Sequence, residues 1–200
     1  MKLITIGVII FTALLFTGCA TKPQYVKTAD APITMGLDRR DFEKAAQAAV
    51  KDMLDSGAMD RKGGGRYVVT MGRMINDTTQ RIDTDMLTKK IRIALLKSGK
   101  AVITTAVGVD GPEDVMTKEV RKLRNDDEFK QSTIAKKGTI YSPDMSLTGK
   151  IIQRTVKANS SDQLVEYYFQ LTMTQLETGL AFWEGETTIG KLGSNDSVTW

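Results

Sequence analysis

The sequence predicts an α/β domain: a three-layer-like sandwich around a mixed sheet that ends in an antiparallel hairpin. Two observations predict this class. Over residues 38–123, apolar patterns with helical spacing alternate with short apolar runs, as expected when helices alternate with strands. From residue 145 onward the period changes to two, which is typical of strands with one face on the core. Hydrophobic residues make up 41% of the 200-residue chain, enough for one domain with its own core.

The first helix is predicted after Asp38, a residue type that commonly caps helix N-termini. Gly57 stands where helices often end in a left-handed residue. A turn over residues 60–65 and a short, mostly buried strand over residues 66–71 follow. The apolar face of this helix, set by spacings of three and four, consists of Phe42, Ala45, Ala46, Ala49, Met53 and Leu54.

A second helix is predicted to begin at Asp83 or Thr84 and to end at Gly99. Its apolar stripe consists of Leu87, Ile91, Ala94 and Leu95. Residues 100–105 form a second strand. A third helix opens at Gly111-Pro112, because proline suits the first helical turn, and is interrupted near residues 125–127.

Three strands are predicted for the remainder of the domain. The first covers residues 145–156, and the second covers residues 165–174, where apolar and polar side chains alternate strictly. Gly179 closes a tight turn before the third strand, over residues 180–189. The predicted element order is therefore α-β-α-β-α-β-β-β, with a C-terminal antiparallel hairpin.

The N-terminal region has the composition of an export signal. Residues 3–16 (LITIGVIIFTALLF) are apolar and follow Lys2; this run is shorter than the roughly 20 residues that a spanning helix needs. It ends in Phe16-Thr-Gly-Cys19, which resembles the lipobox of bacterial lipoproteins. By that resemblance residues 1–18 are a signal peptide and Cys19 is diacylated, and Ala20 after it points to the outer membrane. The alternative is an ordinary secretory signal that leaves Cys19 as a free thiol.

Residues 19–37 are predicted to form the lipidated N-terminus and a linker, because they mix Pro, Thr, Lys and Ala without periodicity. Fully extended, residues 20–37 would reach about 60 Å; as a coil they would average about 25 Å. We therefore expect the domain, residues 38–192, to stay close to its membrane. Residues 193–200 are expected to form a tail.

The composition excludes several kinds of catalytic site. Cys19 is the only cysteine, and the chain has no histidine. Zinc sites of Cys and His, Ser-His-Asp triads and Cys-His proteases are therefore excluded. The net charge of +4, or +3 without Lys2, does not indicate a nucleic-acid partner. We predict no catalytic residue, no metal site and no cofactor.

Other patterns have structural interpretations. The run of three glycines at 63–65 precedes a strand and lacks the Gly-Lys-Ser/Thr ending of a phosphate loop, so it predicts a turn. The acidic residues at 83 and 85 fit helix capping, and those at 126–128 fit a solvated break in a helix; a glycosidase pair is the weaker interpretation. Among the hairpin aromatics, Tyr168 and Trp183 are the candidates for partner contact, with a core role as the alternative for Trp183.

Three stretches carry a family resemblance: residues 76–100 (beginning NDTTQRIDTDML), residues 135–152, and residues 177–183 (ETGLAFW). They resemble the LpoB family, outer-membrane lipoproteins that activate penicillin-binding proteins. The resemblance implies a fold similar to the N-terminal domain of TolB. It also implies a monomeric, non-catalytic protein that docks on a class A penicillin-binding protein and stimulates its glycosyltransferase and transpeptidase activities.

Two other function classes stay open. A structural subunit of an outer-membrane assembly or secretion complex, curli-type or flagellar-surface, would have a similar α/β domain and form large homo-oligomers. A cell-wall hydrolase would release muropeptides without a partner. The family resemblance places the activator first. The hydrolase comes last, because no set of residues supplies a nucleophile, a base and an orienting group together.

Overall fold

The computed structural model describes residue 25, residue 27 and residues 30–197. The predicted signal peptide, Cys19 and the last three residues of the predicted tail lie outside the described residues. Contacts divide the chain into one unit over residues 1–33 and a second over residues 34–200. Every residue of the hydrophobic core belongs to the second unit.

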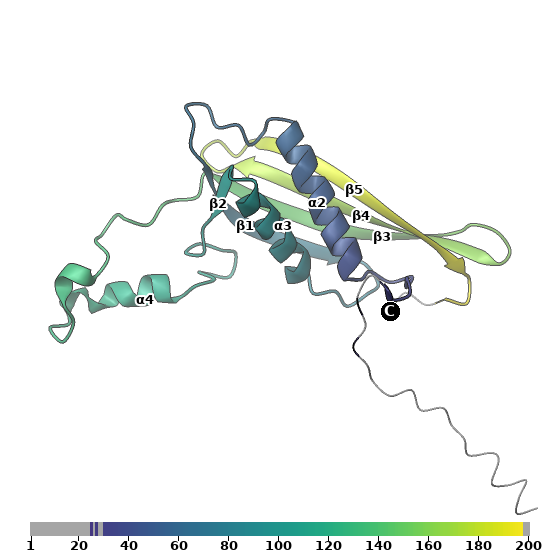
Figure 1. The fold of residues 1–200 in the computed structure, drawn as a ribbon, viewed down its shortest axis with the longest axis horizontal. Helices are drawn as coiled ribbons and strands as arrows, with labels where there is room; N and C mark the ends of the chain where they lie inside the picture. Colours follow the sequence, from purple (N-terminus) through teal and green to yellow (C-terminus); the bar gives the residue numbers. More distant parts are fainter. Residues whose placement is uncertain (1–24, 26, 28–29, 198–200) are drawn as a thin grey trace, which may run out of the picture. The chain divides into compact units, whose positions relative to one another are not determined.

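A five-stranded mixed sheet, in the order β2-β1-β3-β4-β5, forms the centre of the second unit (Figure 1). β1 pairs in parallel with β2 and β3, whereas β3, β4 and β5 pair antiparallel. The parallel pairs require crossovers, which the helices supply. The strands are β1 (Tyr67–Asp77), β2 (Ala101–Ile103), β3 (Met145–Lys157), β4 (Asp162–Gln175) and β5 (Ala181–Ser194).

Two helices, α2 (Arg39–Asp55) and α3 (Asp85–Lys97), pack on each other and on the same face of the sheet (Figure 1). Asp38 caps α2, and its own backbone N–H donates to the Asp41 side chain, which completes a capping box. The backbone N–H of Asp85 donates to Asp83 Oδ1 over 2.9 Å at the start of α3. Three short helices lie between β2 and β3: α4 (Met116–Lys122), η3 (Leu123–Asn125) and η4 (Gln131–Thr133).

The core is one apolar cluster between these two helices and the sheet. β4 contributes every second residue from Val165 to Met173, each at most 3% exposed. The Phe169 ring meets Phe42 of α2 edge to face, with 6.1 Å between ring centroids. The apolar residues with period-two spacing in β4 therefore pack against the apolar residues with helical spacing in α2.

The predicted α/β class, the mixed sheet and the C-terminal antiparallel hairpin are confirmed. The third layer of the predicted sandwich is not found among the described residues. α2 and α3 form one layer, and α4 has only seven residues and buries none of them, so it adds no layer to the described part of the molecule. α4 also begins four residues after Pro112, because residues 108–114 form turns stabilised by Gly111 N–H···O Gly108 and Asp114 N–H···O Thr105 hydrogen bonds.

The ends of the domain differ from the expected boundaries as well. Tyr167 Oη donates to the carbonyl of Met35 over 2.9 Å, and Lys191 Nζ donates to the carbonyl of Gly36 over 2.6 Å. The last residues of the expected linker therefore belong to the folded unit. β5 runs to Ser194, two residues into the expected tail, because it stays paired with β4 as far as Asp162.

Candidate partner-binding site

The face of the sheet that turns away from α2 and α3 carries Tyr168 near its centre. In β4, Tyr168 pairs with Ile152 of β3 and with Thr188 of β5. Its hydroxyl donates to Glu166 Oε2 over 2.9 Å. That hydrogen bond is the largest cause raising the pKa of Tyr168, while the charge of Arg154 beside it acts in the opposite direction. We call this set the Tyr168 surface: Arg154, Glu166, Tyr168 and Thr188.

The rest of this face in β3, β4 and β5 contains no buried residue. It is mostly polar, and its apolar side chains include Ile152 and the paired Val156, Leu164 and Leu192. Lys150 Nζ lies 2.6 Å from Asp77 Oδ2 at the β1 side. Gln170 Nε2 donates to Glu186 Oε2 over 2.8 Å at the β5 side. Tyrosine and arginine are the residue types that most often dominate protein–protein binding energy. The Tyr168 surface therefore has the composition of a partner-binding patch, and partner contact by Tyr168 stays a prediction.

Trp183 lies on the opposite face of the sheet, so the structure does not bring it together with Tyr168. It pairs with Met173 in the core and is 7% exposed. Its indole N–H donates to Asp52 Oδ2 of α2 over 2.9 Å. The ring also covers Gly185, where an added Cβ would lie 2.2 Å from Trp183 Cζ2. This burial fits the core interpretation of Trp183 and leaves the ring little surface for a partner.

A cleft of about 820 Å³, which the sequence did not reveal, borders β1. β2 is only three residues long, so β1 beyond Val69 has no strand partner on that side. The cleft is lined by Arg39, residues 71–74, residues at the start of α3, Thr104 and residues 107–113. Arg92 Nη1 and Glu113 Oε1 form an ion pair of 2.6 Å in its wall. Acidic and basic side chains both line the cleft, so it does not select one sign of ligand charge.

The described residues form no group of three or more His, Cys, Asp or Glu that could hold a metal ion. Within the same residues, every buried side-chain polar atom has a hydrogen-bond partner. No helix of the described part is long and apolar enough to cross a membrane. The N-cap residue of α3 is Thr84, whose side chain makes no cap hydrogen bond. Asp83 Oδ1 instead accepts from the backbone N–H of Asp85, and Asp85 places a negative charge in the first turn. The acidic residues at 126–128 follow the end of η3.

These features define an α/β domain with one helix-covered and one open sheet face. The family model described as peptidoglycan-synthase activator LpoB matches residues 41–189, about three quarters of the chain. The chain belongs to the LpoB family. No curated protein sequence matches it.

Three solved structures have similar folds at low sequence identity. The LpoB C-terminal domain from Escherichia coli is 15% identical, with a TM-score of 0.43, over 76% of this chain and 99% of that one. The LpoB C-terminal domain from Salmonella enterica is 16% identical, with a TM-score of 0.41, over 74% and 98%. Lipoprotein GNA1162 from Neisseria meningitidis is 11% identical, with a TM-score of 0.38, over 66% and 87%.

Proposed function

We propose that this chain is a lipid-anchored, periplasm-facing lipoprotein that binds and activates a class A penicillin-binding protein during peptidoglycan synthesis. The family match carries the proposal, because it runs from α2 almost to the end of β5 and so covers the whole folded core. The family is one of regulatory activators, so the chain would act by binding and not by catalysis. Cys19 is its membrane anchor, in the outer membrane.

The mechanism we propose is a shift between synthase conformations. An activator stimulates an enzyme only when it binds the active conformation more tightly than the inactive one. A tenfold shift in that equilibrium corresponds to about 1.4 kcal/mol of differential binding energy. The Tyr168 surface is the proposed contact, because it offers one aromatic and one guanidinium side chain on a rigid sheet.

The anchor limits where this contact takes place. The folded unit begins at Thr34, so 14 residues separate it from Cys19. A chain of this length spans at most about 50 Å. The domain therefore has to meet the synthase within that distance of the lipid surface, which requires a part of the synthase that projects toward the anchored domain.

The test is a crosslinked pull-down of the lipidated chain from membranes, followed by a peptidoglycan synthesis assay with each synthase recovered. We expect one class A penicillin-binding protein in the pull-down and faster glycan polymerisation and crosslinking when the pure chain is added. Recovery of no synthase, with no stimulation in the assay, contradicts the proposal.

The lipid anchor needs a separate control, because stimulation in solution does not depend on it. The Cys19→Ser chain should stimulate the synthase in detergent but fail to fractionate with the outer membrane. Size measurement of the unlipidated chain distinguishes the structural-subunit alternative: an activator stays monomeric, whereas an assembly component forms large homo-oligomers.

A further inference from the structure

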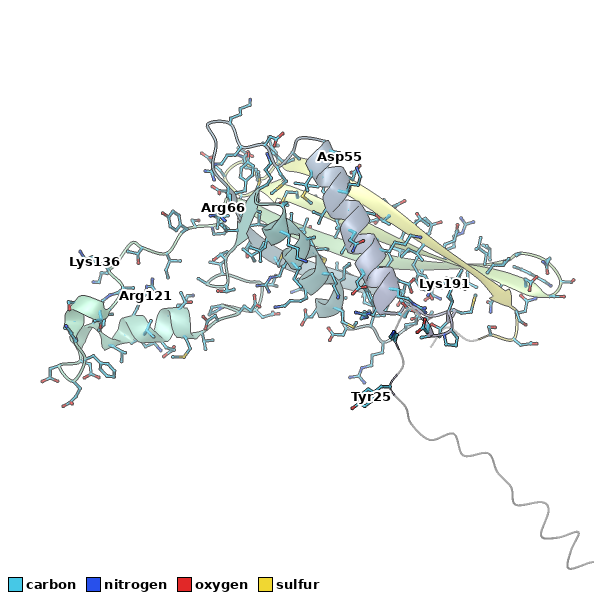
Figure 2. The ribbon with its side chains drawn as sticks, viewed as in Figure 1. Tyr25, Asp55, Arg66, Arg121, Lys136 and Lys191 are labelled. Atoms are coloured by element: carbon cyan, nitrogen blue, oxygen red, sulfur yellow. The ribbon has the colours of Figure 1, made fainter. Side chains whose placement is uncertain are left out.

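Residues 107–141, between β2 and β3, form a segment that we call the excursion. Its local fold depends on polar contacts instead of an apolar core. Arg124 donates to the carbonyl of Ala135 through Nε (3.1 Å) and Nη2 (2.7 Å), and Arg121 Nη2 donates to Thr139 Oγ1 over 3.2 Å. These bonds hold the returning chain beside α4 and η3. Figure 2 labels Arg121 on α4 and Lys136 on the returning chain.

The excursion buries none of its own residues, although it is rich in apolar side chains. It contains eight of the eighteen large hydrophobic residues that are exposed in the described part of the chain. Met116 and Val120 of α4 share one face with Leu123, the first residue of η3. Lys118, Arg121 and Lys122 share another face of α4. The exposed hydrophobic residues are Val107, Val109, Val115, Met116, Val120, Phe129, Ile140 and Tyr141.

The same segment carries exposed cations without partners. Four lysines are exposed, and their ammonium groups form no hydrogen bond or ion pair with the described residues: Lys118, Lys130, Lys136 and Lys137. From residue 115 to residue 137 the sequence has seven basic and four acidic residues. Over the whole excursion, basic and acidic residues are equal in number, at seven each, because Asp110, Glu113 and Asp114 precede residue 115. Its part from residue 115 to residue 137 therefore combines an excess of positive charge with an exposed apolar helix face.

We propose that the excursion binds the surface of an anionic phospholipid bilayer. Amphipathic helices with lysine and arginine on the polar face and large apolar side chains on the other bind at the headgroup boundary. Lysine is depleted in protein–protein interfaces, so unpaired lysines favour lipid over a protein partner. The length of the segment between Cys19 and the folded unit supports a bilayer as the partner, since these 14 residues keep the folded unit within about 50 Å of the anchoring membrane.

Lipid binding would give the domain a membrane-held state in addition to its covalent anchor. This inference rests on the proposed function for the lipid anchor, whose reach supports it, and for the identity of the membrane in the cell. Its test does not depend on the anchor, because the unlipidated chain is used. The folded unit contains every core residue and keeps the excursion, so residues 20–200 are a suitable sample.

The experiment is co-flotation of residues 20–200 with vesicles of phosphatidylglycerol and phosphatidylethanolamine, compared with vesicles of phosphatidylcholine. We expect binding to the anionic vesicles alone, and loss of binding at 0.5 M salt because the lysines are exposed. Lys136→Glu with Lys137→Glu should lower the partition coefficient by about 25-fold or more, since each lysine near an anionic surface contributes about a factor of five. Met116→Ser with Val120→Ser should lower it by about tenfold.

The matched control is Lys44→Glu with Lys62→Glu, which makes the same charge change at two exposed, unpaired lysines outside the excursion. Equal loss of binding by the control would mean that net charge alone attracts the chain, and this overturns the proposal. Failure of the wild-type chain to bind anionic vesicles overturns it too. If the excursion variants bind vesicles normally but no longer stimulate a synthase in detergent, the excursion is a protein-docking element and the lipid proposal is wrong. Stimulation by every variant, without vesicle binding, would overturn this inference and leave the proposed function intact.

Discussion

Lys191 Nζ lies 2.5 Å from Asp41 Oδ2, and the two side chains are 5% and 13% exposed. The pair joins β5 to the first turn of α2, and Figure 2 labels Lys191 near that end of the helix. The same ammonium donates to the Gly36 carbonyl, and the same carboxylate accepts from the Asp38 amide over 2.8 Å. One buried ion pair therefore fixes both the helix start and the chain that enters the domain.

We predict that Lys191→Met destabilises the fold by about 2–4 kcal/mol, because it leaves the Asp41 carboxylate and the Gly36 carbonyl without their cation. Asp41→Asn keeps an acceptor for the helix cap while removing the charge. The double variant should therefore be more stable than Lys191→Met alone. Urea unfolding of the two single variants and the double variant measures this coupling; strictly additive losses would show that the pair does not act as a unit.

A second buried polar group holds the same entry segment and gives a pH-dependent prediction. Tyr167 Oη donates to Met35 O and accepts from Gln80 Nε2. Burial raises the pKa of Tyr167 above its ordinary value of 10. The unfolded chain therefore loses this proton at lower pH than the folded chain. The stabilising contribution of neutral Tyr167 is complete below pH 10 and falls as the pH rises toward the higher folded value.

Tyr167→Phe should cost about 1–2 kcal/mol at neutral pH, because Gln80 and the Met35 carbonyl lose a partner. The gap in unfolding free energy between wild type and Tyr167→Phe should narrow above pH 10, since only wild type carries the ionisable hydroxyl. Denaturant unfolding at several pH values between 7 and 11 checks this. Lysine ionisation affects both proteins equally, so a constant gap would show that Tyr167 has no raised pKa in the folded state.

The helix and strand patterns made much of this fold predictable. Asp38 and Gly57 bracket α2 as expected, and Gly179, with φ of 72°, closes the β4–β5 turn. Strict alternation located β4. β1 extends to Asp77, six residues beyond the expected strand, because its pairing with β3 resumes after an irregularity between Met71 and Met74. A register shift of this kind interrupts the period-two pattern and conceals the strand.

The candidate surfaces were less predictable, because they depend on which elements become neighbours. The burial of Lys191 could not be inferred from the sequence of its strand, because it requires the N-terminus of α2 to lie over β5. The Tyr168 surface also follows from layer arrangement, since a second helix layer would have covered it. The sequence placed Tyr168 on the polar face of its strand but did not reveal that this face stays open.

Trp183→Ala should destabilise the domain by about 3–5 kcal/mol, because it empties a core site between β5 and α2. Trp183→Phe should cost less, since it keeps a ring and loses mainly volume and the hydrogen bond to Asp52. Urea unfolding gives both values. If Trp183→Ala leaves stability unchanged and abolishes synthase binding, Trp183 belongs to the interface instead.

Tyr168→Ala provides the direct test of the Tyr168 surface. The side chain is half-buried on an open face and outside the core, so we expect less than about 1 kcal/mol of lost stability. Loss of a tyrosine anchor should weaken synthase binding by about tenfold. Arg154→Ala should act in the same direction, whereas Lys44→Ala, on the exposed side of α2, should change neither property. Binding constants from titration of the pure synthase decide the question, because unchanged affinity in both Tyr168→Ala and Arg154→Ala would place the synthase contact on another part of the domain.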